Sequence, residues 1–354
     1  MENKNDTFGL TLGGGGVKGF AYIGVFKSSE ENSVNWGNMA GVSVGALAIA
    51  IEAAGYDSSE FRKVVDTLDL KSLQINEAAA LPVVREHKEF MALINSPDTL
   101  PVFNLYNQNP GRISVRKAES RIKSILNNII SFSKDKALLD GDYLEKWVYD
   151  ILANKGIRTF GDLKDGFIDK KNPNGYKIRM TCVDATRIKS VILPDDLVYY
   201  GINPDEFEVA KAVRISTCIP FAFKPVVIKR KGINHYLIDG GVFDTFPYWL
   251  IDNSIYPAIG FRFTNDKKIY SLTTPINIIK NIISSVYDIG IPSYSKTDIN
   301  YIEDIKVSDV ATLDVNLSGE AKAELIESGY NAANNLFNRI VPLSFAGLVK
   351  RLFR

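Results

Sequence analysis

Ser43 is the residue whose type and setting in this sequence most favour covalent chemistry. It stands in the pattern G-x-S-x-G between Gly41 and Gly45, after a short apolar run and before an alanine-rich segment. In that pattern a serine occupies a strained strand-to-helix turn, with its hydroxyl exposed at the positive end of the helix. A serine held there can attack the carbonyl of an ester. A tight turn around a buried serine fits the same five residues, so the motif alone does not decide.

A run of four glycines at residues 13–16 is the second chemical feature. It lies between a predicted strand and a predicted helix. Successive backbone N–H groups at a helix start form a cradle for negative charge, and in acyl transfer such a cradle serves as an oxyanion hole. Lys18 can orient this loop or cap its carbonyl groups.

The same glycines allow a different interpretation as a nucleotide site. Gly14, Gly16 and Gly19 satisfy G-x-G-x-x-G, the fingerprint of dinucleotide binding. That fingerprint requires an acidic residue at the end of the second strand, and residues 36–40 contain none. A P-loop is excluded because Lys18 is followed by glycine rather than by serine or threonine.

Asp239-Gly240-Gly241 is the third chemical feature, at the end of a predicted strand over residues 235–238. A strand that ends there places a carboxylate at a strand tip, where the active sites of open parallel sheets assemble. Asp-Gly is also a common turn signal, so this motif gains its meaning from the other two. Together they make Asp239 a candidate base for Ser43.

The two histidines of the chain, His87 and His235, are poor candidates for that base. His235 lies four residues before Asp239 in the same predicted strand, which is too far along the strand for a bond between them. His87 lies in an irregular, proline-containing segment. We interpret both as structural or surface residues, although a triad in the order Ser, His, Asp stays open.

Short strands and helices alternate around these motifs, which predicts a mainly parallel sheet with helices on both faces. Asp57 with Glu60 forms a predicted capping box, and Asp142 with Glu145 is predicted to cap a helix that runs through residue 152. Strands are expected at residues 8–12, 36–40, 176–183, 224–229, 235–238 and 258–263, with a hairpin turn at 230–232.

Composition excludes several classes of function. The 354 residues are 45% hydrophobic and 23% charged, as in ordinary globular proteins, and the net charge of +1 argues against broad nucleic-acid binding. Cys182 and Cys218 have neither disulfide nor zinc spacing, so we interpret both as reduced core residues. No cluster of metal ligands is visible in the sequence, and no metal or other cofactor is expected. Residues 1–6 lack the apolar core of a secretory signal, and no apolar run approaches the roughly 20 residues of a membrane span. We therefore expect a cytoplasmic location.

Taken together, the three motifs resemble those of the patatin-like phospholipase family. The glycine motif matches at residues 14–19, the serine elbow at 41–45 and the Asp-Gly-Gly motif at 239–241, in the same order. The resemblance covers about residues 8–335 and is weakest over 71–135. Further stretches similar to bacterial members are residues 139–147, 159–163, 212–220 and 312–330.

The resemblance implies a three-layer α/β/α sandwich with a mainly parallel central sheet and a Ser–Asp dyad without histidine. Ser43 would attack the acyl ester of a phospholipid or lysophospholipid, and Asp239 would take its proton. Backbone amides of Gly15, Gly16 and Val17 would hold the oxyanion, and water would release the fatty acid without a metal. The residues expected to support the elbow and the motifs are Gly14, Lys18, Gly19, Gly41, Gly45, Gly240 and Gly241.

One departure from the family pattern lies beside the dyad. Asp244 and Thr245 stand where the family often carries two asparagines before a proline, here Pro247. A further carboxylate at this point could raise the pKa of Asp239 or tune the geometry of the loop. Two other functions stay open from the sequence: a catalytically inactive lipid-binding protein on the same scaffold, and a nucleotide-dependent oxidoreductase.

For domain organisation, we expect residues 1–335 to form one acyl-hydrolase domain, with a less regular insertion or lid at about 71–140. Residues 336–354 are predicted to form a basic amphipathic helix, with Lys350, Arg351 and Arg354 opposite its apolar side chains. Such a helix can lie in a membrane interface and make the protein peripherally membrane-associated, or it can pack on the protein's own surface. The sequence makes no prediction of oligomeric state.

Overall fold

The computed structural model describes residues 7–69, 139–220, 222–252, 256–264, 301–307, 310, 312, 314 and 316–340. The expected lid up to residue 138, the predicted terminal helix from residue 341 and His87 lie outside these described residues.

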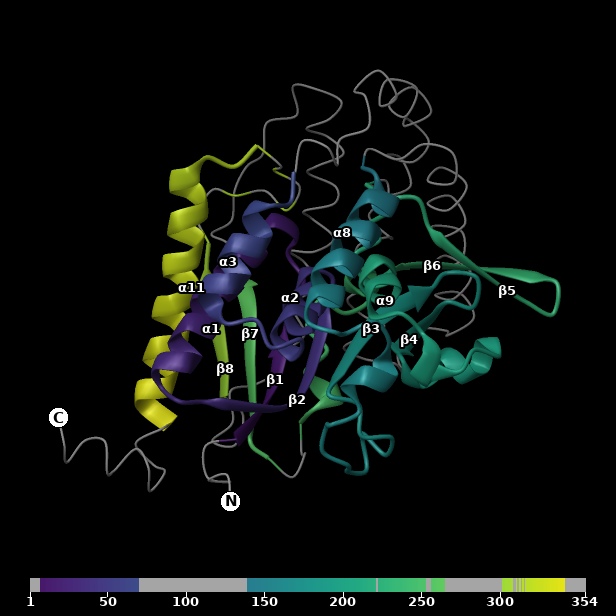
Figure 1. Ribbon diagram of the computed structural model, residues 1–354, viewed down its shortest axis with the longest axis horizontal. Coiled ribbons are helices and arrows are strands. Elements are labelled where there is room, and N and C mark those ends of the chain that lie inside the picture. Colours follow the sequence, from purple (N-terminus) through teal and green to yellow (C-terminus); the bar gives the residue numbers. More distant parts are fainter. Residues whose placement is uncertain are drawn as a thin grey trace, which may run out of the picture.

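An eight-stranded mixed sheet forms the centre of the protein (Figure 1). The strand order is β5-β6-β3-β2-β1-β7-β8, and β4 also pairs with β3. The neighbouring strands β3, β2, β1, β7 and β8 pair in parallel. The pairs β3–β4, β3–β6 and β5–β6 are antiparallel. The strands are β1 (Thr7–Leu12), β2 (Asn35–Val42), β3 (Ile178–Asp184), β4 (Lys189–Leu193), β5 (Val226–Arg230), β6 (Ile233–Asp239), β7 (Ala258–Thr264) and β8 (Tyr301–Lys306).

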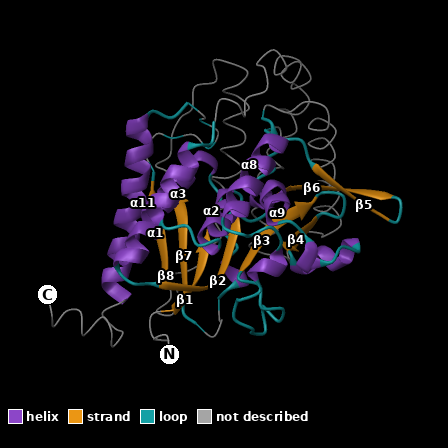
Figure 2. Ribbon diagram, viewed as in Figure 1, coloured by secondary structure: helices purple, strands orange, loops and turns teal. Residues whose placement is uncertain are grey.

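The described α-helices lie in front of the sheet in the view of Figure 2. Helix α1 packs along α11, α2 packs on β2, and α8 packs on α9, which lies on β3. The expected α/β fold with a mainly parallel sheet is thereby confirmed, while the boundary expected at residue 335 falls within α11. The α-helices are α1 (Ala21–Glu31), α2 (Val44–Ala53), α3 (Ser58–Asp66), α8 (Gly141–Asn154), α9 (Val209–Ser216) and α11 (Gly319–Ile340).

The two faces of the sheet carry side chains of different size. Along β1, Phe8, Leu10 and Leu12 belong to the main core, and the intervening Gly9 and Thr11 point to the opposite face. Small residues of neighbouring strands share that opposite face, which allows a non-helical segment to pack close to it. This second core consists of Ala40, Phe246, Tyr248, Leu250, Ile251, Ala258 and Ile302.

Among the described residues, the segment around Phe246 packs on this second face. Its only regular element is the short 3-10 helix η8 (Tyr248–Leu250). The other 3-10 helices in the described ranges are η2 (Gly16–Phe20), η4 (Phe160–Leu163), η5 (Asp195–Tyr200), η6 (Pro204–Glu206) and η7 (Gly240–Val242).

Of the two predicted helix caps, one is confirmed and one is wrong. The capping box of α3 is present, because Glu60 N–H donates to Asp57 Oδ1 at 2.7 Å and Asp57 N–H donates to Glu60 Oε2 at 3.1 Å. The prediction that Asp142 and Glu145 cap the next helix was wrong. Asp140 caps α8 instead, since its Oδ1 accepts from the N–H groups two and three residues later, at 2.9 and 3.1 Å.

Membrane-spanning elements are absent from the described ranges of the chain. The longest described helix, α11, carries charged side chains along its length, and no other described helix is both long and apolar enough to cross a bilayer.

Candidate active site

Ser43 occupies the turn between β2 and α2 with a backbone that few residues other than glycine adopt. Its φ and ψ are 56° and −126°. A Cβ on Gly41 would stand 2.6 Å from the carbonyl carbon of Gly45, and a Cβ on Gly45 would overlap the carbonyl oxygen of Leu12. The absence of side chains at both glycines lets α2 begin directly against β1 and β2. The turn therefore places Ser43 at the N-terminus of α2, where negative charge is stabilised.

Ser216, the last residue of α9, fixes the backbone of this turn. Ser43 N–H donates to Ser216 Oγ at 3.0 Å, and Ser216 Oγ donates to the carbonyl oxygen of Thr181 at 2.8 Å. All three residues are buried. The sequence reasoning gave Ser216 no role; its only signal was its place in the stretch 212–220 that resembles the family.

Asp239 lies at the same level of the sheet as Ser43. Asp239 on β6 pairs with Cys182 of β3, while on the other side of β3 the residue before Ser43, Val42, pairs with Thr181. Ser43 and Asp239 therefore flank the end of β3 from its two sides. Both are buried, with exposed fractions of 1% and 0%.

The backbone around Asp239 is fixed by its own motif and by the segment after α9. Asp239 Oδ1 accepts from the N–H of Gly241 at 2.7 Å, inside η7. Asp239 N–H donates to the carbonyl oxygen of Cys218 at 2.9 Å. Ser216 thus bonds the backbone of Ser43, and Cys218 bonds the backbone of Asp239. The end of α9 and the residues just after it therefore link the two members of the candidate dyad.

The glycine loop leads from β1 into η2 and is held from both ends. Gly14 N–H donates to the carbonyl oxygen of Thr245 at 2.9 Å, and Val17 N–H donates to that of Thr312 at 3.1 Å. Within the described part of the chain, no acceptor bonds the N–H of Gly15 or Gly16. Of the three amides expected to hold an oxyanion, those of Gly15 and Gly16 are therefore available as the loop stands.

Gly16 has a conformation and a neighbour that exclude other residues. Its φ is +57°, and a Cβ there would overlap the carbonyl oxygen of Thr312. Tyr22 of α1 donates its hydroxyl to the carbonyl oxygen of Gly13 at 2.6 Å, and burial raises the pKa of that phenol. Lys18 is buried in the same turn. Packing from several directions thus makes this loop rigid.

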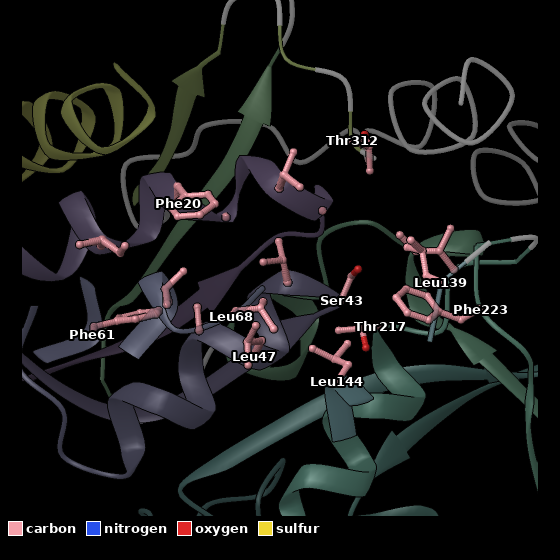
Figure 3. Close-up of a pocket in the computed structure, with 18 residues that line it drawn as sticks. Phe20, Ser43, Leu47, Phe61, Leu68, Leu139, Leu144, Thr217, Phe223 and Thr312 are labelled. Atoms are coloured by element: carbon pink, nitrogen blue, oxygen red, sulfur yellow. The ribbon is translucent and has the colours of Figure 1, made fainter. Parts of the chain in front are cut away.

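A cavity of about 130 Å³ opens at Ser43. In Figure 3, Ser43 lies between one group of apolar side chains that includes Phe61 and Leu47 and another that includes Leu139 and Phe223. Among the described residues that line the cavity, none is charged, and only Ser43, Thr217 and Thr312 carry a side-chain oxygen. The lining is Gly16, Val17, Gly19, Phe20, Ile23, Ser43, Val44, Leu47, Ala48, Phe61, Val65, Leu68, Leu139, Leu144, Thr217, Ile219, Phe223 and Thr312.

A known protein family matches the part of the chain that carries the glycine loop, Ser43 and Asp239. The model of patatin-like phospholipases matches residues 10–251, more than half of the chain. The protein belongs to the patatin-like phospholipase family. Membership of the family supports lipid acyl hydrolase activity in general.

Relatives of the chain agree with this assignment. The uncharacterized protein YqhO of Bacillus subtilis (strain 168) is 30% identical over 322 residues, which cover 89% of this chain and 93% of YqhO. The uncharacterized protein R571 of Acanthamoeba polyphaga mimivirus is 22% identical over 348 residues, 94% of each chain. The crystal structure of VipD from Legionella pneumophila has a similar fold, with a TM-score of 0.52 and 16% identity over 94% of this chain and 67% of VipD.

His235 is engaged away from the cavity of this patatin-like protein. Its Nδ1 lies 2.8 Å from Oδ2 of the buried Asp184, and the Tyr200 hydroxyl donates to the same oxygen at 2.9 Å. The ring also packs edge to face against Tyr199 and Tyr200. These contacts describe a structural histidine, which is one of the two roles expected for it.

Asp244, which departs from the family pattern, stabilises the conformation of the segment that follows it. Its Oδ1 accepts from Phe246 N–H at 2.9 Å and its Oδ2 accepts from the indole N–H of Trp249 at 2.8 Å. Burial raises the pKa of this carboxyl, and the two hydrogen bonds oppose that rise. The carboxylate thus fixes the segment that covers the second face of the sheet, next to Thr245, whose carbonyl oxygen holds Gly14.

Proposed function

We propose that this protein cleaves fatty-acyl esters of phospholipids or lysophospholipids, with Ser43 as nucleophile and Asp239 as its base. The observation that carries the proposal is the position of Ser43: a strained turn presents its hydroxyl to an apolar cavity without a charged lining residue among those described. An apolar cavity suits an acyl chain, since each buried methylene contributes about 0.8 kcal/mol.

In the first half of the reaction, Ser43 Oγ attacks the ester carbonyl carbon while the Asp239 carboxylate takes the hydroxyl proton. The carbonyl oxygen becomes an oxyanion, stabilised by the N–H groups of Gly15 and Gly16 and by the N-terminus of α2. The Val17 amide joins them only if its bond to Thr312 opens. The ester bond then breaks, and the leaving alcohol carries away the proton from Asp239.

In the second half, Asp239 accepts a proton from water, and the resulting hydroxide attacks the acyl-serine. The same amides stabilise the second oxyanion. The fatty acid leaves as the Ser43 oxygen regains the proton held by Asp239. No step of this scheme requires a histidine.

Labelling with a fluorophosphonate probe, combined with product analysis by mass spectrometry, tests the proposal. Wild-type protein should be labelled and should release fatty acid from a mixed pool of phospholipids and lysophospholipids. Ser43→Ala should lose both, with a fall in turnover on the order of 10⁴-fold or more. Ser190→Ala, which changes an exposed serine on β4, is the matched control.

The same experiment separates the alternatives. Retained labelling and turnover in Ser43→Ala, with unchanged melting, would contradict Ser43 as nucleophile. A wild-type protein that binds lipid but neither reacts with the probe nor releases fatty acid would be the catalytically inactive lipid-binding protein instead.

A further inference from the structure

Exposed apolar side chains gather on the hairpin of β5 and β6 and on the adjacent η5. Four large apolar side chains are exposed among the described residues, and three of them lie here: Val198 at 65%, Val227 at 47% and Ile233 at 56%. Figure 1 shows the hairpin extending away from the body of the protein. Apolar residues that are exposed singly are normal, but a group of them marks a contact surface.

The same hairpin concentrates positive charge. Residues 224–236 contain Lys224, Lys229, Arg230 and Lys231 and no acidic residue, in a chain whose net charge is only +1. Lys229 and Lys231 are exposed. Arg230 is the cross-strand partner of Ile233, so a cation and an exposed apolar side chain lie beside each other on one face of the hairpin.

Two arginines stack on one tyrosine ring at the base of this surface. The guanidinium carbons of Arg187 and Arg230 lie 3.6 and 3.9 Å from the centre of the Tyr199 ring. A guanidinium that stacks on a ring keeps its N–H edge available for phosphate oxygens. The ring thus orients both cations in advance, which lowers the entropy lost when they bind an anion.

One nearby carboxylate, Asp184, pairs with Arg187, so the excess positive charge of this surface comes from the hairpin itself. Asp184 is fully buried and bonded to His235 and Tyr200, and its Oδ2 lies 3.9 Å from Arg187 Nε. Asp196 of η5 accepts a hydrogen bond from the N–H of Ile192. The outward surface therefore combines excess positive charge with exposed apolar groups, the two features that bind a protein to an anionic lipid interface.

We propose that the β5–β6 hairpin and η5 form a docking surface for anionic lipid membranes. Arg187 and Arg230 bind lipid phosphate groups, and Val198 and Ile233 enter the interface. Lys231 in the turn and Lys229 on the opposite face of the hairpin add long-range attraction to the membrane. The choice of a lipid partner rests on the proposed function. β5 begins three residues after Phe223 of the cavity wall and β6 ends at Asp239, so the docked hairpin is continuous with the site.

Vesicle co-sedimentation tests this surface in a Ser43→Ala background, where the lipid stays intact. The hairpin variant is Lys229→Glu with Lys231→Glu. The control variant, Lys27→Glu with Lys146→Glu, makes the same charge change at exposed lysines of α1 and α8. Binding to vesicles of phosphatidylcholine and phosphatidylglycerol should weaken on the order of 30-fold or more in the hairpin variant, since each cation at such a surface changes affinity about fivefold. The control should change it less than about threefold by the same scale.

Two further variants test the apolar and arginine contributions. Val198→Asp with Ile233→Asp should lower binding even in high salt, where charge attraction is screened. Arg230→Lys keeps the charge but loses the flat guanidinium, and should bind about fivefold more weakly. Melting temperature and turnover of a soluble short-chain ester, measured with Ser43 intact, should be unchanged for all of these variants.

A failure of the docking proposal can be distinguished from a failure of the proposed function. Missing ester turnover in the wild type would overturn the hydrolase proposal and leave the binding measurement valid. Unchanged vesicle binding in the hairpin variant, or equal losses in the hairpin and control variants, would overturn the docking surface. Equal binding to vesicles of phosphatidylcholine alone would overturn the requirement for anionic lipid, and unchanged binding of Arg230→Lys would overturn the phosphate contact.

Discussion

The parallel and antiparallel parts of the sheet differ in how closely the chain packs and in what they expose. Around β1 and β2, glycines bring backbones into direct contact and bury Ser43, Gly13 and Gly15. At β5 and β6, the chain extends into solvent with lysines and apolar side chains exposed. Asp239 lies where the two parts meet. From this comparison we expect the proposed chemistry to depend on the tightly packed part and the proposed membrane contact to depend on the extended part.

Asp239→Asn should produce the largest effect of the changes considered below, because it removes the proposed base at the junction of the two parts. Turnover should fall on the order of 10³-fold or more, since no histidine shares the role. Steady-state kinetics with a soluble ester measure the loss, and circular dichroism checks the fold. A variant that keeps more than a tenth of wild-type turnover would separate Asp239 from the chemistry.

Gly16→Ala tests the packed part of the sheet. The new side chain would need a φ near +57° and would overlap the Thr312 carbonyl oxygen, so the loop must shift. Displaced oxyanion donors should lower kcat on the order of 10²-fold. Gly319→Ala, where no neighbour lies within contact distance, is the control and should keep wild-type kcat. Equal kcat values in the two variants would mean that the geometry of this loop does not matter.

Ser216→Ala should have a smaller effect on the same region. It leaves the Ser43 N–H and the Thr181 carbonyl oxygen without their shared hydroxyl, which should cost about 1–3 kcal/mol of unfolding free energy. We expect kcat to fall about tenfold with little change in KM, because the turn that carries the nucleophile shifts while the apolar cavity that binds the substrate keeps its shape. Ser216→Thr should restore part of kcat. A change in KM alone would argue against a positioning role.

His235→Gln should affect stability rather than catalysis. It removes a partner of the buried Asp184 carboxylate, with an expected cost of about 1–3 kcal/mol in unfolding free energy. Turnover of a soluble ester should stay within a few-fold of wild type. Urea denaturation provides the first value and steady-state kinetics the second. A loss of turnover approaching that of Asp239→Asn would instead support a triad.

The local sequence predicted the parts of the site that depend on neighbours in the chain. Glycines on either side of Ser43 predicted a strand-to-helix turn, and Asp239 does end a strand, because both signals act within five residues. Asp140 was missed as a cap because Asp142 and Glu145 offered an equally good local pattern. Ser216 could not be found by such reasoning, since its hydrogen bonds with Ser43 and Thr181 join residues far apart in sequence.

The strand order shows the same contrast between features predicted from nearby residues and features that depend on distant segments. Alternating strands and helices predicted the parallel centre of the sheet, where α1 connects β1 to β2. The strands β4 and β8 were not predicted, and the antiparallel pairing of β6 with β3 depends on contacts between distant segments. On the second face, the small residues Gly9, Ala40 and Ala258 let the segment around Phe246 pack close to the strands, which depends on contacts between distant segments.

The bond between Val17 N–H and the Thr312 carbonyl oxygen has a consequence for how the enzyme matures. It joins the glycine loop near the start of the chain to a residue that the ribosome adds almost three hundred positions later. A nascent chain that already contains Ser43 and Asp239 still lacks this tether, and it also lacks α11, against which α1 packs. The packing of the glycine loop is therefore completed only late in synthesis, after both residues of the candidate dyad have left the ribosome.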